Sequence, residues 1–327
     1  MMKSIIVNAY GGPEVLKVEN IEMPSPQSNE ILIKIEATSV TRASVMMRSG
    51  TPYFGRLFTG ISKPKVKTPG TDLSGVVEAV GSSVTKFKVG DKVMAATDLK
   101  CGAYAEYICM AENEMIIHQP DNLTAEEATG IIDGGCTALA FFTDQVTINA
   151  GDKVLINGAS GSIGTAAIQL AMSFGAEVTA ICSGKNKDLV LEIGADHVLD
   201  YTKNELDTNT TKFDVIFDTV GKLSFFKAKK HLTSKGVFLT PVLEFPALMT
   251  MLFVNPFSKQ KLKFAATGLR KQDVRIRDLK KITELLANNK LRTVIDKVYS
   301  LDQIQDAHAY VDAGHKRGNV IIKMEHA

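Results

Sequence analysis

The sequence of 327 residues lacks an excess of one charge, paired cysteines and long apolar runs. Its 38 basic residues nearly balance 36 acidic ones, and the formal charge of +2 gives no electrostatic reason to expect nucleic-acid binding. The four cysteines have no short paired spacing, which indicates free thiols in a reducing compartment. The most apolar stretch, residues 245–257, is too short to span a bilayer and contains two prolines.

The N-terminal segment also lacks the apolar core of a signal peptide. A run of only three apolar residues, 5–7, precedes Asn8, and this pattern predicts a strand. We therefore expect a cytoplasmic protein with neither a transmembrane segment nor a signal peptide.

The length suits two domains, and the residue pattern changes once along the chain. The first 120 or so residues contain strand-like segments broken by Gly and Pro, which predicts an antiparallel, barrel-like β domain. From residue 123, where Thr124 can cap a helix, short apolar strands alternate with helical segments and predict a parallel sheet. The expected strands are 153–157, 177–181, 197–200, 214–218, 236–240 and 261–266. A helix over 277–290 and two late strands, 293–300 and 319–324, follow, and we expect these strands to return to the first domain.

A glycine-rich turn carries the strongest local signal. A buried-type strand ends at Asn157, and the run 159–164, ASGSIG, follows just before an apolar helix. This run is the dinucleotide fingerprint with Ala in place of the first Gly. Gly161 would let a pyrophosphate approach the backbone, Gly164 would let helix and strand touch, and the helix N-terminus would hold the anion. The alternative is a tight turn without a ligand, which the strand–helix context on both sides disfavours.

The end of the second strand indicates which dinucleotide binds. Proteins with this fingerprint that bind NAD have an acidic side chain at the end of the second strand, where it hydrogen-bonds the ribose 2′-OH. This chain has Cys182 and Ser183, followed by Lys185 and Lys187, and no carboxylate in that stretch to repel a 2′-phosphate. The pattern predicts NADPH; the alternative is that the lysines only form the solvated start of a helix.

The chain resembles the medium-chain dehydrogenase/reductase superfamily, in its zinc-free quinone oxidoreductase branch. The resemblance rests on an ordered series of segments: TPGTDLSGVVEAVG (68–81), VGDKV (89–93), GAYAEY (102–107), TALAFF (137–142), the glycine-rich turn and IGADHVLDY (193–201). It implies an α/β protein in which a Rossmann domain, a doubly wound parallel sheet, interrupts a GroES-like β-barrel domain. The implied boundaries are 1–122, 123–268 and 269–327, and a homodimer is usual in such families.

The resemblance also assigns cofactor residues by position. It implies that the pyrophosphate lies against four residues of the turn, Ser160, Gly161, Ser162 and Ile163. It places the 2′-phosphate at Ser183, Lys185 and Tyr201. It places the nicotinamide beside Thr137, Thr240 and Val242.

Zinc-using relatives have ligands that this sequence lacks. Their Gly-His-Glu is Gly70-Thr71-Asp72 here, and the segment that holds their cysteine is residues 38–41, TSVT. The six histidines fall outside both segments, and the region of the structural zinc, residues 91–115, holds only two cysteines. A catalytic zinc needs three protein ligands and an open position. The sequence therefore predicts no metal.

Without a Lewis acid, a conjugated acceptor is the favoured substrate. A quinone or an α,β-unsaturated carbonyl delocalises the charge left by hydride transfer, so the protein needs mainly to orient two planar molecules. The candidate hydroxyls are Thr41, where the family has Asn, and Tyr53 in a loop. The alternatives are a non-catalytic NADPH-binding sensor and a zinc alcohol dehydrogenase with unusual ligands. For the Met- and Phe-rich residues 243–257 the sequence leaves three roles open: the wall of a substrate pocket, a subunit contact, or part of the core.

Overall fold

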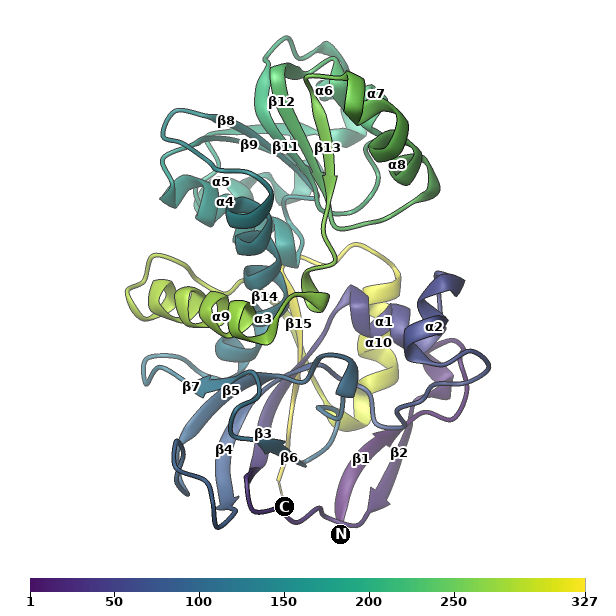
Figure 1. Ribbon diagram of the computed structural model, residues 1–327, viewed down its shortest axis with the longest axis vertical. Helices are drawn as coiled ribbons and strands as arrows, with labels where there is room; N and C mark the ends of the chain where they lie inside the picture. Colours follow the sequence, from purple (N-terminus) through teal and green to yellow (C-terminus); the bar gives the residue numbers. More distant parts are fainter. Residues whose placement is uncertain (327) are drawn as a thin grey trace. The chain divides into compact units, whose positions relative to one another are not determined.

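The computed structural model describes residues 1–326, which fold as two compact units (Figure 1). The first unit comprises Met1–Asp133, Lys271–Asn288 and the C-terminal stretch from Arg292, and the second comprises Gly134–Arg270 and Asn289–Leu291. Helix α3 (Ala125–Ala140) runs through the first division, so it contributes residues to both units. These divisions fall after residues 133 and 270, whereas the sequence predicted boundaries at 122 and 268, and those boundaries stay predictions.

The first unit is built on a seven-stranded sheet in the order β14-β15-β3-β4-β5-β7, with β6 paired to β3. Its strands are β3 (Glu30–Val40), β4 (Asp72–Val80), β5 (Lys92–Ala96), β6 (Tyr107–Ala111), β7 (Ile116–His118), β14 (Ile295–Ser300) and β15 (Asn319–Lys323). All pairings are antiparallel except β14 with β15. The late strands thus join the sheet of the first 120 residues, which confirms that prediction.

The remaining elements of the first unit are a small antiparallel pair and four helices. The pair is β1 (Met2–Ile6) with β2 (Lys17–Ile21), and the helices are α1 (Arg42–Ser49), α2 (Arg56–Thr59), α9 (Gln272–Ala287) and α10 (Ile304–Asp312). The alternating apolar residues of β3 and β4 point into a core that α10 also covers, with Ile33, Leu73 and Ile304 almost fully buried. This core fixes the position of α1, which packs against α10.

The second unit is a six-stranded sheet in the order β10-β9-β8-β11-β12-β13, and every pairing is parallel. Its strands are β8 (Lys153–Asn157), β9 (Glu177–Cys182), β10 (His197–Asp200), β11 (Phe213–Asp218), β12 (Leu232–Thr240) and β13 (Lys261–Phe264). Its helices besides α3 are α4 (Ser162–Ser173), α5 (Lys187–Glu192), α6 (Glu205–Thr208), α7 (Phe225–Lys229) and α8 (Phe245–Met249). All six predicted strands are present, and the doubly wound parallel sheet is confirmed.

The observed starts of α3 and α9 can be compared with the helix starts that the sequence predicted. The predicted cap of α3 is correct, since Thr124 Oγ1 accepts from the Glu127 amide at 3.2 Å and the Glu127 carboxylate accepts from the Thr124 amide at 2.9 Å. The predicted helix 277–290 is α9, which begins five residues earlier, at Gln272, and ends at Ala287. It has no side-chain cap among the described residues, so its start left little signal in the sequence. Within residues 1–326, no helix is both long and apolar enough to cross a bilayer.

Candidate cofactor and active site

The glycine-rich turn of the second unit joins β8 to α4 and is as tight as the sequence predicted. Gly158 has a φ of +74°, a conformation that suits glycine, and its carbonyl accepts from the Gly161 amide at 3.0 Å. A Cβ on Gly164 would lie 2.3 Å from the Gly158 carbonyl oxygen, so only glycine fits there. A Cβ on Gly161 would meet only that oxygen, at 3.4 Å, so the backbone at Gly161 is open to an approaching ligand.

The N-terminus of α4 supplies the anion-binding groups. Gly161 is the residue before the helix, and no side chain of the described residues caps it. The amides of the first turn and the helix dipole therefore point toward the space beside Gly161, an arrangement that suits a phosphate. Helix α3 passes close by, because a Cβ on Gly134 would lie 2.6 Å from Ser162 Oγ. This contact brings Thr137, one turn further along α3, to the same region of the second unit.

Ser183 and Tyr201 lie at the ends of neighbouring strands. Cys182 of β9 is in register with Asp200 of β10, so the next residues along the two strands are Ser183 and Tyr201. Ser183 is buried, whereas Tyr201 is 52% exposed and Lys185 is exposed. The ends of β9 and β10 thus bring the Ser183 hydroxyl and the Tyr201 phenol to one corner of the sheet, and Lys185 follows in the adjoining loop. Their role at a 2′-phosphate stays a prediction.

Two residues that the sequence reasoning missed hold this corner together. Asp200 accepts hydrogen bonds from the Thr202 hydroxyl at 2.7 Å and from its amide at 2.9 Å, and these bonds, with one from the Gly184 amide, lower its pKa. A carboxylate is therefore present beside the loop that carries Lys185, contrary to the expectation from the β9 residues alone. It comes from β10, the adjacent strand, and its oxygens are already engaged.

Asn186 is the second residue of this kind, and it joins the two halves of the cofactor site. Its side-chain Nδ2 donates to Ser160 Oγ at 3.0 Å, and its amide donates to the Ser183 carbonyl at 2.8 Å. Because the Ser160 oxygen accepts this bond, its own hydroxyl hydrogen stays available for a phosphate oxygen. Asn186 is only 5% exposed, and in the sequence the available signal was an asparagine three residues after Ser183.

The carboxyl ends of β11 and β12 form the other half of this edge. Thr240 Oγ1 accepts from the Val242 amide at 3.2 Å, and the Val242 side chain lies against Gly221, whose φ is +70°. Asp218, 1% exposed, accepts from the Leu223 amide at 2.8 Å and from Asn157 Nδ2 at 2.9 Å, and burial raises its pKa. In open parallel sheets, ligands bind outside the carboxyl ends of the strands. The residues predicted for the nicotinamide are therefore at a suitable edge, and together these residues fit a dinucleotide.

In the first unit, the segments that hold zinc in relatives form a hydroxyl-rich network. Ser39 Oγ donates to Asp72 Oδ2 at 2.8 Å, and Thr38 Oγ1 donates to the Asp72 carbonyl at 2.6 Å. Thr41 caps α1, its Oγ1 accepting from the Ser44 amide at 3.1 Å. Hydroxyls and one engaged carboxylate do not make a zinc donor set. Among the side chains that the structure describes, which leave out those of Phe54 and Asp98, no three from His, Cys, Asp or Glu are placed to share a metal.

The candidate hydroxyls of this unit differ in exposure. Thr41 is 5% exposed and its oxygen lies 3.1 Å from Ser44 Oγ, so its hydroxyl is both a cap and part of a buried pair. Tyr53 is 73% exposed, and its ring lies 4.7 Å from the Arg56 guanidinium carbon in a cation–π contact. The structure does not bring the two hydroxyls into a hydrogen bond among the described residues. Their catalytic roles stay predictions.

A buried Tyr–His pair supports the hydroxyl network. His308, fully buried on α10, lies with Nε2 3.2 Å from Tyr104 Oη, which donates to the Ser39 carbonyl at 3.1 Å. Burial, together with the charge of Arg48, lowers the pKa of His308 to about 3. Arg48 is itself buried and donates to Asp312 at 2.6 Å. His308 is therefore neutral in the folded protein at physiological pH, and it links α10 to the region of Thr41.

His308 gives the stability of the protein a specific pH dependence. The unfolded histidine titrates near 6.5 and the folded one near 3, so between these values the unfolded chain binds a proton that the folded chain does not. The free energy of unfolding should therefore fall on acidification, by up to about 1.4 kcal/mol per pH unit from this group. In urea titrations from pH 7 to 4, His308→Gln should show a shallower fall than the wild type. Tyr104→Phe, which keeps the histidine, is the control, and equal slopes in all three proteins would contradict the assignment.

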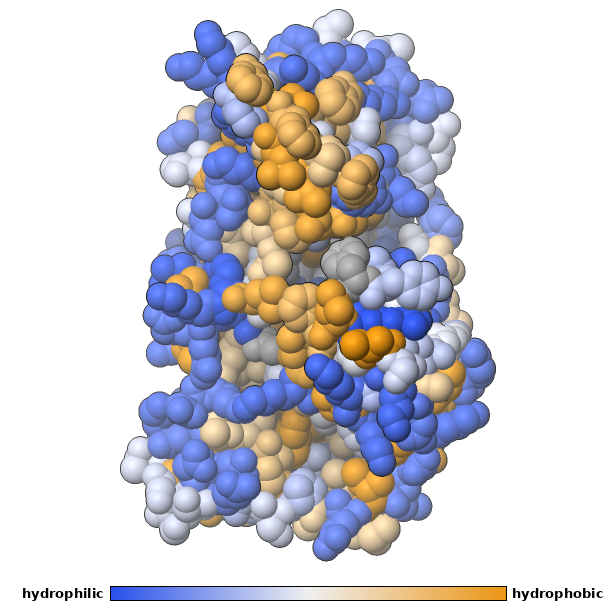
Figure 2. Space-filling view, turned by 45° about the vertical axis from the view of Figure 1, so that its right-hand side comes forward, coloured by the Kyte–Doolittle hydropathy of each residue, from blue (hydrophilic) through white to orange (hydrophobic). Residues whose placement is uncertain are grey.

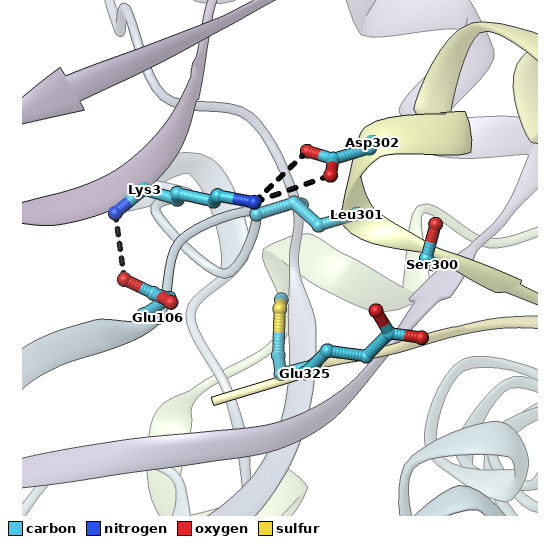
Figure 3. A pocket seen from close by; sticks show the side chains of 7 residues that line it. Lys3, Glu106, Ser300, Leu301, Asp302 and Glu325 are labelled. Atoms are coloured by element: carbon cyan, nitrogen blue, oxygen red, sulfur yellow. Dashed lines mark hydrogen bonds and ion pairs between the residues drawn. The ribbon is translucent and has the colours of Figure 1, made fainter. Parts of the chain in front are cut away.

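A small hollow in the first unit is a structural feature and offers no ligand site. It has a volume of about 10 Å³ and is lined by Lys3, Glu106 and Asp302 among others (Figure 3). Lys3 Nζ lies 3.2 Å from Asp302 Oδ2, and the Lys3 amide donates to Glu106 at 2.7 Å. A space of this size holds about one water molecule.

Comparison with known proteins agrees with this fold. Residues 27–121 match the alcohol dehydrogenase GroES-like domain family, and residues 193–322 match the zinc-binding dehydrogenase family. Quinone-oxidoreductase QR1, chloroplastic, of Triphysaria versicolor is 31% identical over 341 residues, which cover 99% of this chain and 98% of that protein. The NADPH-dependent alkenal/one oxidoreductase, chloroplastic, of Arabidopsis thaliana is 30% identical, covering 98% of this chain and 79% of that protein. The structure of the quinone oxidoreductase from Coxiella burnetii has a TM-score of 0.88 at 28% identity, covering 99% of both chains.

The parallel nucleotide-binding sheet, the GroES-like unit and the matched relatives define an oxidoreductase fold. The chain belongs to the medium-chain dehydrogenase/reductase superfamily, in its quinone oxidoreductase-like branch. The family resemblance and the fold class inferred from the sequence are thereby confirmed.

Proposed function

We propose that this protein is a zinc-independent, NADPH-dependent reductase of quinones or α,β-unsaturated carbonyls. The observation that carries the proposal is the open backbone at Gly161 beside the uncapped N-terminus of α4, a site for the cofactor pyrophosphate. Ser183, Lys185 and Tyr201 at the corner of the same sheet support NADPH over NADH. The names of the two plant relatives, a quinone oxidoreductase and an alkenal/one oxidoreductase, support the acceptor class.

The residues at the positions of the catalytic zinc support a reaction without a Lewis acid. When bound, the cofactor supplies a hydride. An acceptor of this class spreads the resulting negative charge over a conjugated oxygen, so hydrogen-bond donors suffice to stabilise it. Asp72 is engaged with Ser39, and the nearby hydroxyl of Thr41 is the kind of neutral donor that this chemistry needs. The overall reaction takes up one proton and yields a hydroquinone or a saturated carbonyl.

The proposal assigns roles to the chain's own residues. Ser160, Ser162 and Ile163 hold the pyrophosphate together with Gly161, while Thr137, Thr240 and Val242 orient the nicotinamide half. Thr41 and Tyr53 are the proposed hydrogen-bond donors to the acceptor. We also retain a homodimer and a cytoplasmic location as parts of the proposal; the names of the two plant relatives describe those proteins as chloroplastic.

A panel of acceptors tests the activity. NADPH absorbance is followed with purified protein and para-benzoquinone, phenanthrenequinone or an alkenal, and separately with a simple alcohol and NADP⁺. We expect oxidation of NADPH by a quinone or an alkenal, at an unchanged rate after treatment with a chelator. Tight NADPH binding without turnover on any acceptor would instead support a sensor, and alcohol oxidation abolished by chelation would support a zinc dehydrogenase.

A further inference from the structure

Two half-buried residues of opposite charge in the first unit, Asp133 and Lys316, have no role in the site described so far. Figure 2 shows that hydrophilic residues cover much of the molecular surface, where a charge is well solvated. Asp133 is in α3 instead, and Lys316 is in the loop that joins α10 to β15. Each of the two groups acts electrostatically on the other. Such a pair, drawn partly out of water, is a candidate for a chemical role.

The end of the chain packs on the turn of α3 that precedes Asp133. Thr293 Oγ1 donates to the Glu127 carbonyl of α3 at 2.7 Å. Gly130 stands one further turn along the helix, and a Cβ there would lie 2.8 Å from Thr293 Cγ2 and 3.5 Å from Asn319 Cβ. The residues before β14 and the start of β15 are therefore in contact with α3 three residues before the carboxylate.

The loop before β15 brings the ammonium group of Lys316 to the same place. Lys316 Nζ donates to the Gly318 carbonyl at 2.6 Å, so the side chain folds back along its own loop. Gly318 has a φ of +75°, and a Cβ on it would overlap the Val294 carbonyl oxygen, so this loop lies tightly against the residues before β14. The Asn319 amide donates to the same oxygen at 2.8 Å. The ammonium is thus held beside the part of α3 that carries Asp133.

Burial and the surrounding charges change the pKa of both groups. Burial raises the pKa of Asp133, and the charge of Lys316 opposes this rise. Burial lowers the pKa of Lys316 to about 8, against the opposing effects of Asp133 and Asp296. Asp296 of β14 is engaged elsewhere, since it accepts from Tyr310 Oη of α10 at 2.8 Å and from the Arg317 amide at 2.7 Å. The pair of Asp133 and Lys316 therefore carries a proton that it can give up near neutral pH.

Asp133 also has a defined position relative to the proposed cofactor site. It lies four residues before Thr137 on the continuous helix α3, and residues with this spacing share one face of a helix. Thr137 is one of the residues proposed beside the nicotinamide half. The carboxyl group is therefore on the face of α3 that the proposal turns toward the reacting groups. The reaction takes up a proton, and the roles given so far name hydrogen-bond donors but no acid.

We propose that Asp133 and Lys316 together supply the proton that completes the reduction of an α,β-unsaturated carbonyl. The inference rests on the proposed function. The C=C π bond breaks as the hydride forms a C–H bond at the β-carbon, which leaves an enolate. The electron pair of the enolate then forms a C–H bond at the α-carbon with the proton of the Asp133 carboxyl group. Lys316 acts through Asp133, because it returns a proton to the carboxylate and is itself reprotonated by water.

The pH dependence of alkenal reduction tests the pair. At saturating NADPH, kcat of the wild type should fall above about pH 8, as Lys316 loses its proton. Lys316→Met and Asp133→Asn should each lower kcat at pH 7 at least about ten-fold with little change in the KM for NADPH, and Lys316→Met should also remove the fall above pH 8. Lys323→Met is the matched control, because Lys323 pairs with Glu126 of the same helix at 2.8 Å, and it should keep the wild-type profile.

The configuration of the product gives a readout that a merely structural role would not move. A 2-methyl alkenal is reduced in D₂O, and the product is analysed by NMR and chiral chromatography before it epimerises. The wild type should place solvent deuterium on one face of the α-carbon. Asp133→Asn, in which water protonates the enolate, should give both configurations at the α-carbon while the hydride still enters on one face of the β-carbon.

Quinone reduction separates this inference from the proposed function. It protonates oxygen, for which water suffices, so both variants should keep quinone reduction within about three-fold of the wild type. If the wild type reduces neither quinones nor alkenals, the proposed function fails, and this inference fails with it. Reduction of quinones but of no alkenal would overturn this inference alone. Wild-type kcat and α-configuration in Asp133→Asn, or equal losses with quinone and alkenal, would also overturn it.

Discussion

Gly161→Ala should weaken NADPH binding with little effect on the stability of the protein, whereas Gly164→Ala should weaken NADPH binding and also destabilise the fold. The Gly161 backbone is extended, with φ of −83°, and an added Cβ meets only one protein atom, at 3.4 Å. We expect the free energy of unfolding to change by less than about 1 kcal/mol. If a pyrophosphate lies against this backbone, the methyl group occupies its place, and NADPH affinity should fall at least roughly ten-fold.

Gly164 provides the matched comparison three residues away. Its Cβ would stand 2.3 Å from the Gly158 carbonyl oxygen and 2.7 Å from Ala159 backbone atoms, so the turn must shift. Overpacking of this kind costs about 1–3 kcal/mol, and the displaced turn should also lose the cofactor. Thermal unfolding and NADPH fluorescence titration of both variants give the two readouts. A Gly161→Ala protein that binds NADPH as the wild type does would show that the dinucleotide lies elsewhere.

The double variant Ser183→Ala/Lys185→Ala should lose its preference for NADPH over NADH. Both residues follow β9 at the corner where Tyr201 follows β10, and neither belongs to the apolar core cluster of this sheet. A charge-assisted hydrogen bond is worth about 1.5–3 kcal/mol, so NADPH affinity should fall roughly 10- to 100-fold while NADH affinity stays the same. Titration of both cofactors at two salt concentrations measures the effect, which should be larger at low salt.

Lys153→Ala is the control for this selectivity. Lys153 begins the central strand β8, so it lies at the amino ends of the strands, away from the carboxyl ends that carry Ser183, and its ammonium lies 3.6 Å from Glu177. Its removal lowers the charge of the unit equally without touching the proposed 2′-phosphate corner. An equal loss of NADPH affinity in this control would mean that overall charge, and not Ser183 and Lys185, sets the preference.

The parallel sheet and its glycine-rich turn were predictable because their signals are local. A buried β-strand, a glycine-rich turn and an apolar helix follow one another in sequence, and Gly158 and Gly164 each have a steric reason that the structure bears out. The same holds for Thr124, whose cap and reciprocal Glu127 bond need only four consecutive residues.

The features that escaped prediction depend on contacts between distant residues. Asp200 reaches the loop after β9 only because β10 lies beside β9 in register, and no spacing within either strand reveals that. The Tyr104–His308 pair joins residues 204 positions apart, through the packing of α10 on the sheet of the first unit. For residues 243–257 the sequence left pocket, subunit contact and core open, and the structure shows a core-facing side together with an exposed aromatic face.

The central claim, hydride transfer to a conjugated acceptor without a metal, is tested most directly with deuterated NADPH. The chelator-treated enzyme is given NADPH carrying deuterium at the transferred position together with an alkenal, and the product is examined by mass spectrometry and NMR. The account predicts one deuterium per product, on the carbon β to the carbonyl, at the rate of the untreated enzyme. Deuterium on the carbonyl carbon, with activity lost on chelation, would contradict it.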